Sequence, residues 1–149
     1  MKKRFLVISG PNLNLLGKRK TSIYGDVSLD EIHEGLRARA AEHSVDVECV
    51  QSNSEGAIID HLQRAPEEFD GIIINAGALA HYSLALRSAI GATLLPCVAI
   101  AMSNVYAREE DFRHKSVIAS VCVGSITGFG KDSYLLALDA LADLTKVKS

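Results

Sequence analysis

A tyrosine near the start of the chain follows a run of cations: Tyr24 comes shortly after Lys18, Arg19 and Lys20. A phenol has an ordinary pKa of about 10, so it acts as a general base at neutral pH only where nearby cations favour the phenolate. The cation run supplies such a field, which makes Tyr24 a candidate base. A tyrosine packed at a loop end beside a solvated cation run is the commoner meaning of this pattern.

Two further segments combine polar side chains with small residues. The apolar run Gly71-Ile-Ile-Ile-Asn75 ends on an amide, and small residues then lead to His81. Because small residues let a ligand approach the backbone, Asn75 and His81 are candidates for binding, with strand-end or loop hydrogen bonds as the alternative. The segment 103–116 is dense in donors, and an arginine there could clamp a carboxylate or hydroxyls, although a surface charge run is the commoner meaning.

Familiar phosphate, hydrolase and metal motifs fail on spacing. A P-loop has four residues between its glycines, whereas six separate Gly10 from Gly17, and an arginine follows the lysine. The stretch 124–130 lies at the wrong end of the chain for a dinucleotide fingerprint, and no G-x-S-x-G elbow presents a serine. Three histidines on helical segments lack metal-ligand spacing and are expected at the surface: His33, His43 and His61. We therefore expect no metal site.

Length and composition favour one compact domain spanning residues 1–149. A formal net charge of −2 supplies no field for coating nucleic acid or an acidic membrane. The cysteines are odd in number, lie far apart within apolar runs and are expected to be buried free thiols: Cys49, Cys97 and Cys122. No apolar stretch approaches the roughly 18 residues of a membrane span, so we expect a cytoplasmic protein.

Short apolar runs alternate with helical periodicity along the chain. Strands are predicted over 5–8, 45–50, 71–75, 96–102 and 117–123. A first helix is predicted to begin at Ser28, whose spacing to Glu31 fits a capping box. A second helix is predicted to follow the capping signature Ser52 to Glu55. Two further helices are predicted over 82–90 and 134–144.

This alternation predicts an α/β fold, in which a doubly wound, flavodoxin-like five-stranded parallel sheet forms three layers with its helices. Ligands bind such sheets outside the carboxyl ends of the strands. The loops expected to converge on a site there are 9–25, 51–55, 75–82, 102–116 and 124–131. These loops hold most of the chemically capable residues, and 124–131 is expected to be a tight glycine-rich turn.

With these residues in view, the chain resembles the type II 3-dehydroquinate dehydratases. The matching segments run in order across nearly the whole length: Gly10-Pro-Asn-Leu-Asn-Leu-Leu-Gly17 with Arg19 and Tyr24-Gly25; Gln51-Ser-Asn53 with Glu55-Gly56 and Ile59-Asp60; Gly71-Ile-Ile-Ile-Asn75 with Gly77-Ala78 and His81; and Ser103-Asn104 with Ala107-Arg-Glu109 and Phe112-Arg-His114. Jointly these motifs are highly specific.

The resemblance implies a dodecamer built from trimers, no cofactor, and anti elimination of water from 3-dehydroquinate through an enolate, giving 3-dehydroshikimate. Such a reaction serves the shikimate pathway or quinate catabolism. By the same resemblance, Tyr24 is the base, Arg19 lowers its pKa, and Asn12 helps to hold a water that stabilises the enolate oxygen. The first loop would be a mobile lid. The remaining matches would hold the substrate's carboxylate and hydroxyls: Asn75, His81, the backbone at Met102, Ser103 and Arg113.

The chain departs from the family pattern at expected site positions. The family's Glu-x-His on the fourth strand, where the histidine protonates the leaving hydroxyl, is replaced by Ala99 and Ala101. The family's aspartate that reaches a neighbouring subunit's site is Ser88, and the acidic residue after the lid arginine is Lys20. Since a general acid typically contributes about 10² to 10⁴ in rate, we expect impaired or altered elimination.

Three alternatives follow from these departures. A substitute donor could come from Tyr106, Tyr82 or an ordered water. The chain could instead be an inactive or repurposed paralogue that binds a related cyclic polyol carboxylic acid or uses Tyr24 in other proton abstraction. A structural or nucleic-acid-binding module ranks last, because it would not need the polar set described above.

Overall fold

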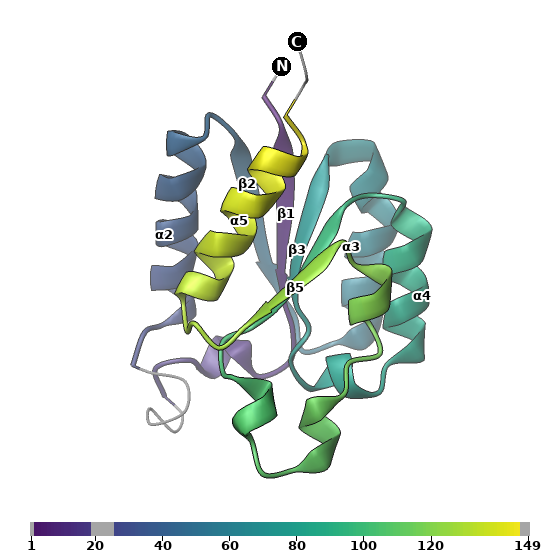
Figure 1. The fold of residues 1–149 in the computed structure, drawn as a ribbon. Helices are drawn as coiled ribbons and strands as arrows, with labels where there is room; N and C mark the ends of the chain where they lie inside the picture. The colour runs from purple at the N-terminus through teal and green to yellow at the C-terminus, as the bar shows by residue number, and fades with distance from the viewer. Residues whose placement is uncertain (1, 19–25, 147–149) are drawn as a thin grey trace.

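The computed structural model describes residues 2–18 and 26–146 and shows one sheet of five parallel strands (Figure 1). The strands are β1 (Arg4–Ser9), β2 (Asp46–Gln51), β3 (Gly71–Asn75), β4 (Cys97–Ala101) and β5 (Gly124–Thr127). The longer helices are α2 (Leu29–Glu42), α3 (Glu55–Glu68), α4 (Leu84–Thr93) and α5 (Asp132–Leu144). The strand order β2-β1-β3-β4-β5 confirms the predicted doubly wound α/β class.

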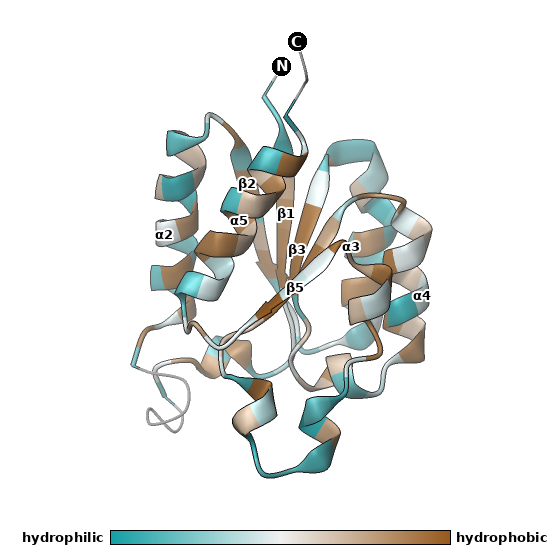
Figure 2. Cartoon of the chain, viewed as in Figure 1, coloured by the Kyte–Doolittle hydropathy of each residue, from teal (hydrophilic) through white to brown (hydrophobic). Residues whose placement is uncertain are grey.

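Helices cover both faces of the sheet because the central strands are apolar on both sides. In β1, Phe5 and Val7 pack toward α2 and α5, whereas Leu6 and Ile8 join the cluster that contains side chains of α3 and α4. Figure 2 shows the resulting pattern, with hydrophobic strands between helices whose outer faces are hydrophilic. Burial on both faces explains why β1 and β3 are continuous apolar runs without alternation.

The first predicted cap is confirmed and the second is wrong by two residues. Ser28 Oγ accepts a hydrogen bond from the Glu31 backbone N–H at 3.2 Å and so begins α2. The cap of α3 is Ser54, whose Oγ accepts from the Ala57 N–H at 3.2 Å. Ser52 instead accepts from the Ser54 N–H at 3.0 Å, which forms a turn ahead of the helix.

The predicted fifth strand is wrong in position. Residues 117–123 include a 3₁₀ turn, η5 (Ala119–Val121). Four of their apolar side chains pack onto the α3/α4 cluster: Val117, Ile118, Val121 and Cys122. The strand that pairs with β4 is β5, within the stretch expected to be a glycine-rich turn. Because β5 lies at the sheet edge and is largely exposed, it has no need of a continuous apolar run.

The helix predicted over 82–90 begins later than expected, at Leu84. Residues Gly77–His81 form a 3₁₀ helix, η2, and Ser83 then caps α4 by accepting from the Leu86 N–H at 3.0 Å. The backbone therefore changes direction between β3 and α4. This change holds residues 77–81 at the carboxyl end of β3.

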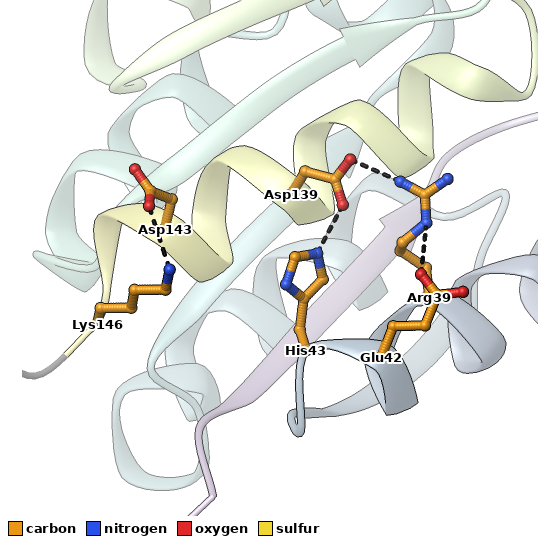
Figure 3. Close-up of polar contacts among 6 residues, drawn as sticks. All are labelled: Arg39, Glu42, His43, Asp139, Asp143 and Lys146. Atoms are coloured by element: carbon orange, nitrogen blue, oxygen red, sulfur yellow. Dashed lines mark hydrogen bonds and ion pairs between the residues drawn. The ribbon is translucent and has the colours of Figure 1, made fainter.

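A charged cluster joins α2 to α5 (Figure 3). Asp139 on α5 accepts from Arg39 Nη1 at 2.6 Å and is bonded to His43 Nε2 at 2.7 Å. Arg39 Nε also lies 3.5 Å from Glu42 Oε2. Partial burial would raise the pKa of Asp139, but the hydrogen bonds and charges of His43 and Arg39 outweigh it and lower that pKa. His43 therefore takes part in the contact between α2 and α5 through its hydrogen bond with Asp139.

Candidate active site

A cavity of about 260 Å³ opens at the carboxyl ends of β1, β3 and β4. This is the edge where the strand order reverses, since β1 lies between β2 and β3. Apart from Ser88, the expected site residues that the structure describes all line this cavity, both alanines included: Asn12, Asn75, His81, Ala99, Ala101, Met102, Ser103 and Arg113. Arg19, Lys20 and Tyr24 lie outside the described residues. Ser88 is exposed on α4 and does not line the cavity.

The buried end of the cavity is fixed by a hydrogen-bond network around Tyr134. Asn75 Nδ2 donates to Tyr134 Oη at 3.1 Å, and Asn75 Oδ1 accepts from the Gly77 N–H at 3.3 Å. Ser9 Oγ lies 2.9 Å from the same Tyr134 oxygen. Burial raises the pKa of Tyr134 to about 12, so the phenol stays protonated. The network fixes the side chain of Asn75 at the cavity wall.

The sequence alone did not reveal Tyr134 as part of this network, because it reads as an apolar position of the last helix. Its partners Ser9 and Asn75 are both buried polar residues at the ends of apolar strands. A buried polar side chain needs a hydrogen-bond partner. That requirement was the available signal, but it does not say which distant residue answers it.

Asn12 lies at a tight turn after β1. Its backbone is in the left-handed region, with φ 71°, which asparagine tolerates better than most residues. Its N–H donates to Asn53 Oδ1 at 3.0 Å, and Gln51 Nε2 donates to the same oxygen at 3.1 Å. Residues 51–53 thus hold the turn that brings Asn12 to the cavity.

Contacts with Lys115 and Phe112 position His81, and Phe112 also contacts Arg113. His81 Nδ1 lies 2.7 Å from the Lys115 carbonyl oxygen, which can only accept, so Nδ1 carries the proton. Phe112 packs edge-on against the His81 ring, with centroids 5.6 Å apart, and the Arg113 guanidinium lies 4.9 Å from the Phe112 ring centre. This arrangement leaves Nε2 of His81 for a ligand.

A carboxylate orients Arg113 as well. Arg113 Nε donates to Glu110 Oε2 at 3.2 Å. A hydrogen bond from its own backbone N–H lowers the pKa of Glu110, and the charges of Arg113 and Arg108 lower it further, against the opposing effect of burial. Because Glu110 bonds to Nε of Arg113, it holds one edge of the guanidinium group and so fixes its orientation.

Two methyl groups occupy the β4 side of the cavity. Ala99 and Ala101 pair in register with Ser125 and Thr127 of β5, and all four residues line the cavity. Tyr106 also lines it, although its side chain is 68% exposed, whereas Tyr82 is 65% exposed and lies outside the lining. The hydroxyl-bearing residues Ser125 and Thr127 therefore lie beside positions 99 and 101, which themselves lack the glutamate and histidine expected from the family.

Besides the phenol of Tyr106, the ionisable residues among the described lining are Lys, Arg and His: His81, Arg108, Arg113, His114 and Lys115. Among the described residues, no aspartate or glutamate lines the cavity. Within the same part of the chain, no three His, Cys, Asp or Glu side chains gather as metal ligands. The site is therefore built to hold anions and to form hydrogen bonds.

The family model described as dehydroquinase class II matches residues 3–142. The chain belongs to this family. A protein of Pelotomaculum thermopropionicum named 3-dehydroquinate dehydratase is 52% identical over 95% of this chain and 97% of its own length. A protein of Halothermothrix orenii with the same name is 50% identical over 96% of each chain. The family expected from the sequence motifs is thus confirmed.

Solved structures agree with the family assignment. The type II dehydroquinase from Butyrivibrio crossotus has a TM-score of 0.92 and 43% identity, covering 94% of this chain and 97% of its own. A 3-dehydroquinate dehydratase-like protein from Bifidobacterium longum has a TM-score of 0.70 and 27% identity, covering 95% of this chain and 97% of its own. The dehydroquinase fold therefore extends over nearly the whole chain.

Proposed function

We propose that this dehydroquinase-family chain is a lyase that dehydrates 3-dehydroquinate, with a slow elimination step. The observation that carries the proposal is the composition of the cavity wall. Asn12, Asn75 and His81 line the same cavity as the methyl groups of Ala99 and Ala101. Three residues that the family resemblance assigns to holding water or substrate thus line the cavity, while the positions expected for the acid and its support carry methyl groups, which cannot donate a proton.

In the proposed reaction, Tyr24 as phenolate removes a proton from the carbon beside the substrate carbonyl, and Arg19 favours the phenolate. Asn12 helps to hold a water against the enolate oxygen. When the enolate collapses, its C=O bond reforms and a C=C bond forms to the ring carbon that loses the hydroxyl. The oxygen of the departing hydroxyl must gain a proton to leave as water. Since methyl groups cannot donate one, we expect the second step to be slower by about 10² to 10⁴ than with a placed acid.

Substrate binding in this proposal uses groups at the strand ends and on the 103–116 segment. The carboxylate and hydroxyls are held by Asn75, His81, Ser103, the backbone at Met102 and Arg113. Support comes from their common lining of one cavity and from the bonds that fix them, including Asn75 to Tyr134 and His81 to the Lys115 carbonyl.

Restoring the acid tests this mechanism. The enone absorbance formed from 3-dehydroquinate is followed for wild type, Ala101→His and the double variant Ala99→Glu/Ala101→His. We expect the double variant to be faster, and Ala107→His, at an exposed alanine outside the cavity lining, to match wild type. A wild type that turns over as fast as the double variant would refute the proposal of a missing acid.

Hydrogen exchange separates the two chemical steps. If Tyr24 works without an acid, the wild type should exchange the C2 proton of 3-dehydroquinate with deuterated solvent faster than it forms the enone. Mass spectrometry of recovered substrate measures this exchange. Enone formation that keeps pace with exchange would show that elimination is not impaired.

A second candidate function is a non-catalytic paralogue that binds a related cyclic polyol carboxylic acid. The replacement of three site positions by Ala99, Ala101 and Ser88 favours it. This candidate predicts binding of quinate-like acids with neither exchange nor dehydration in wild type, and no recovery of activity in the double variant. Recovery of dehydration in that variant would exclude it.

We also propose a cytoplasmic homo-oligomer, built from trimers up to a dodecamer, that acts on a small molecule without a cofactor. Support for association comes from large apolar side chains that are exposed in the single chain, among them Leu94 at 92%, Leu84 and Phe129. Within the described residues, no helix is both long and apolar enough to cross a bilayer. Light scattering after size exclusion measures the mass of the assembly.

A further inference from the structure

Two of the three cysteines meet where the last two strands begin. Cys97 is the first residue of β4, Cys122 lies just before β5, and these strands pair in parallel. The Val123 N–H donates to the Cys97 carbonyl at 2.8 Å, so the residue that follows one cysteine is bonded to the other. Neither cysteine lines the cavity. Strand pairing thus brings together two thiols that are well separated in the sequence.

The two side chains lie on the same face of the sheet. Cys97 is a buried member of the α3/α4 cluster, and Cys122 packs against that cluster while remaining half-buried. All three cysteines are free, but full burial, as expected from the sequence, holds for Cys97 alone. The pair therefore combines a thiol that a small solute can reach with one that is protected.

A hydrogen bond between these thiols makes them chemically unequal. Its effect lowers the pKa of Cys122, although partial burial opposes the change. The same bond, together with burial, holds the pKa of Cys97 well above its ordinary value. The thiolate is the nucleophilic form of cysteine. Cys122 is therefore the reactive member of the pair, and Cys97 keeps its proton.

The third cysteine lies apart from this pair. Cys49 is on β2, which forms the opposite edge of the sheet from β5 (Figure 1). Its side chain packs against the cluster that contains side chains of α2 and α5, on the other face. Burial raises the pKa of Cys49 to about 11. Cys49 is thus an unpaired reference thiol within the same chain.

We propose that Cys97 and Cys122 form a site of reversible thiol oxidation, at which hydrogen peroxide oxidises Cys122 and Cys97 then closes a disulfide. In the first step the Cys122 thiolate takes one oxygen from peroxide, which gives a sulfenic acid and hydroxide. In the second step the Cys97 sulfur bonds to the Cys122 sulfur, and the sulfenic hydroxyl leaves as water with the Cys97 proton. The proton that Cys122 released when it became a thiolate neutralises the hydroxide. Two thiols and one peroxide thus give one disulfide and two waters.

The disulfide would close residues 97–122 into a covalent loop. That loop contains the cavity lining contributed by β4 and by the segment that follows it, up to Ala119. Arg87 Nη1 already donates to the Val117 carbonyl at 2.8 Å and so ties this segment to α4. A bond at Cys122 adds a covalent tie on the far side of η5. We therefore expect oxidation to slow local opening of the backbone around η5.

Counting free thiols tests the oxidation. The full chain is reduced, treated with hydrogen peroxide, unfolded in urea that already contains iodoacetamide, and examined by mass spectrometry. We expect three alkyl groups on the reduced chain and one, on Cys49, after oxidation, together with a peptide that joins Cys97 to Cys122. Dithiothreitol should restore all three sites. An oxidised chain that still takes three groups, or a disulfide that joins two copies of the chain, would overturn the inference.

Single substitutions separate the roles of the three thiols. In Cys97→Ala, the Cys122 sulfenic acid has no partner and should accumulate, where dimedone traps it. In Cys122→Ala, whose change falls at a half-buried position, Cys97 should resist peroxide. Cys49→Ser should form the same disulfide as wild type. We expect Cys122 to react at least about tenfold faster than Cys49, and equal rates would refute the assignment of Cys122 as the reactive thiol.

Hydrogen exchange tests the consequence for the fold. The N–H groups of Val121 and Cys122 donate to the Ile118 and Ala119 carbonyls, each at 3.1 Å. Their exchange should slow by about threefold or more when wild type is oxidised, and should not slow in Cys97→Ala after the same treatment. Unchanged exchange in the oxidised wild type would refute the proposed tie between β4 and the segment around η5.

Discussion

Replacing Tyr134 by phenylalanine removes one oxygen from the buried network behind the cavity. That oxygen lies 3.1 Å from Asn75 Nδ2 and 2.9 Å from Ser9 Oγ. The ring is fully buried, so phenylalanine preserves its packing. The change therefore isolates the polar contribution of the hydroxyl.

The expected cost follows from the partners left behind. A buried polar group without a hydrogen-bond partner costs about 1–3 kcal/mol. In the variant, Ser9 Oγ and Asn75 Nδ2 each lose the Tyr134 oxygen as a partner. The Asn75 amide keeps, among the described residues, the bond that its Oδ1 accepts from the Gly77 N–H at 3.3 Å. We expect a loss of about 2–4 kcal/mol in the free energy of unfolding. A less firmly held Asn75 should also raise KM for 3-dehydroquinate more than it lowers kcat.

A pH series gives the same substitution a second readout. Burial raises the pKa of Tyr134 to about 12, against about 10 for an unfolded tyrosine. Above pH 10 the unfolded state releases a proton that the folded state keeps, so stability falls as pH rises toward 12, by about 1.4 kcal/mol per pH unit from this group. The phenylalanine variant lacks this contribution and should lose less stability over that range.

Urea unfolding of wild type and variant at pH 7 and at several alkaline pH values measures both effects. Tyr82→Phe, at an exposed tyrosine, is the control and should change neither quantity. A loss below about 0.5 kcal/mol at pH 7 would refute the reasoning about unpaired buried groups. An unchanged alkaline slope in Tyr134→Phe would refute the assignment of that slope to this phenol.

Three shorter predictions concern other parts of the fold. Asp139→Asn should lower stability by about 1 kcal/mol at neutral pH and flatten the acid limb, because a carboxylate with a lowered pKa loses its stabilising effect as pH falls through that pKa; urea unfolding against pH checks this. Gly10→Ala should cost about 1–3 kcal/mol or more, measured by urea unfolding, since its Cβ would lie 2.7 Å from the Ala76 carbonyl oxygen. Asn53→Ala should raise KM several-fold in steady-state kinetics, because Asn53 holds the Asn12 turn.

Each of these changes has a control in the same chain. Gly56→Ala on α3 places its Cβ no nearer than 3.8 Å to a neighbouring atom and should be neutral or stabilising, in contrast to Gly10→Ala. Asp143→Asn removes an exposed carboxylate on α5, so equal acid limbs in it and in Asp139→Asn would contradict the role of Asp139. Asp60→Ala, exposed on α3, should leave KM unchanged, and a matching rise there would contradict the role of Asn53.

The sequence predicts the central strands well because they are buried on both faces. Continuous apolar runs mark β1, β3 and most of β4, and one capping serine, Ser28, marks where α2 starts. The run 117–123 misleads because hydrophobicity reports burial and not strand pairing: these residues pack as a loop and a 3₁₀ turn. The exposed edge strand β5 carries no such signal, and its pairing with β4 is decided by contacts distant in sequence.

The candidate site is predictable in part for the same reason. Residues that follow apolar strands, such as Asn75 and Ser103, must lie at one edge of a parallel sheet, and motif resemblance adds Asn12 and Arg113. The partners that fix them are less accessible from sequence. Tyr134 meets Asn75 across 59 positions of chain, and Glu110 bonds Arg113 within a loop whose local turn no periodicity describes. Such pairings depend on the completed fold.

The paired loss at positions 99 and 101 has a physical basis that leads to a further prediction. Ala99 is only 7% exposed and packs in the α3/α4 cluster beside Ile74, whereas Ala101 is more open to the cavity. A lone glutamate at position 99 would be a buried charge next to alkyl groups, which is costly without a partner. Histidine at position 101 would supply that partner.

A double-mutant cycle in urea tests this coupling. Ala99→Glu alone should lose about 2–4 kcal/mol in the free energy of unfolding, because its carboxyl must either stay charged without a partner or become protonated. Ala101→His alone should cost little, since this position is partly open. The double variant should recover at least about 1 kcal/mol relative to the sum of the single changes. Strict additivity would show that positions 99 and 101 are independent, and the acid could then be lost without loss of the residue that supports it.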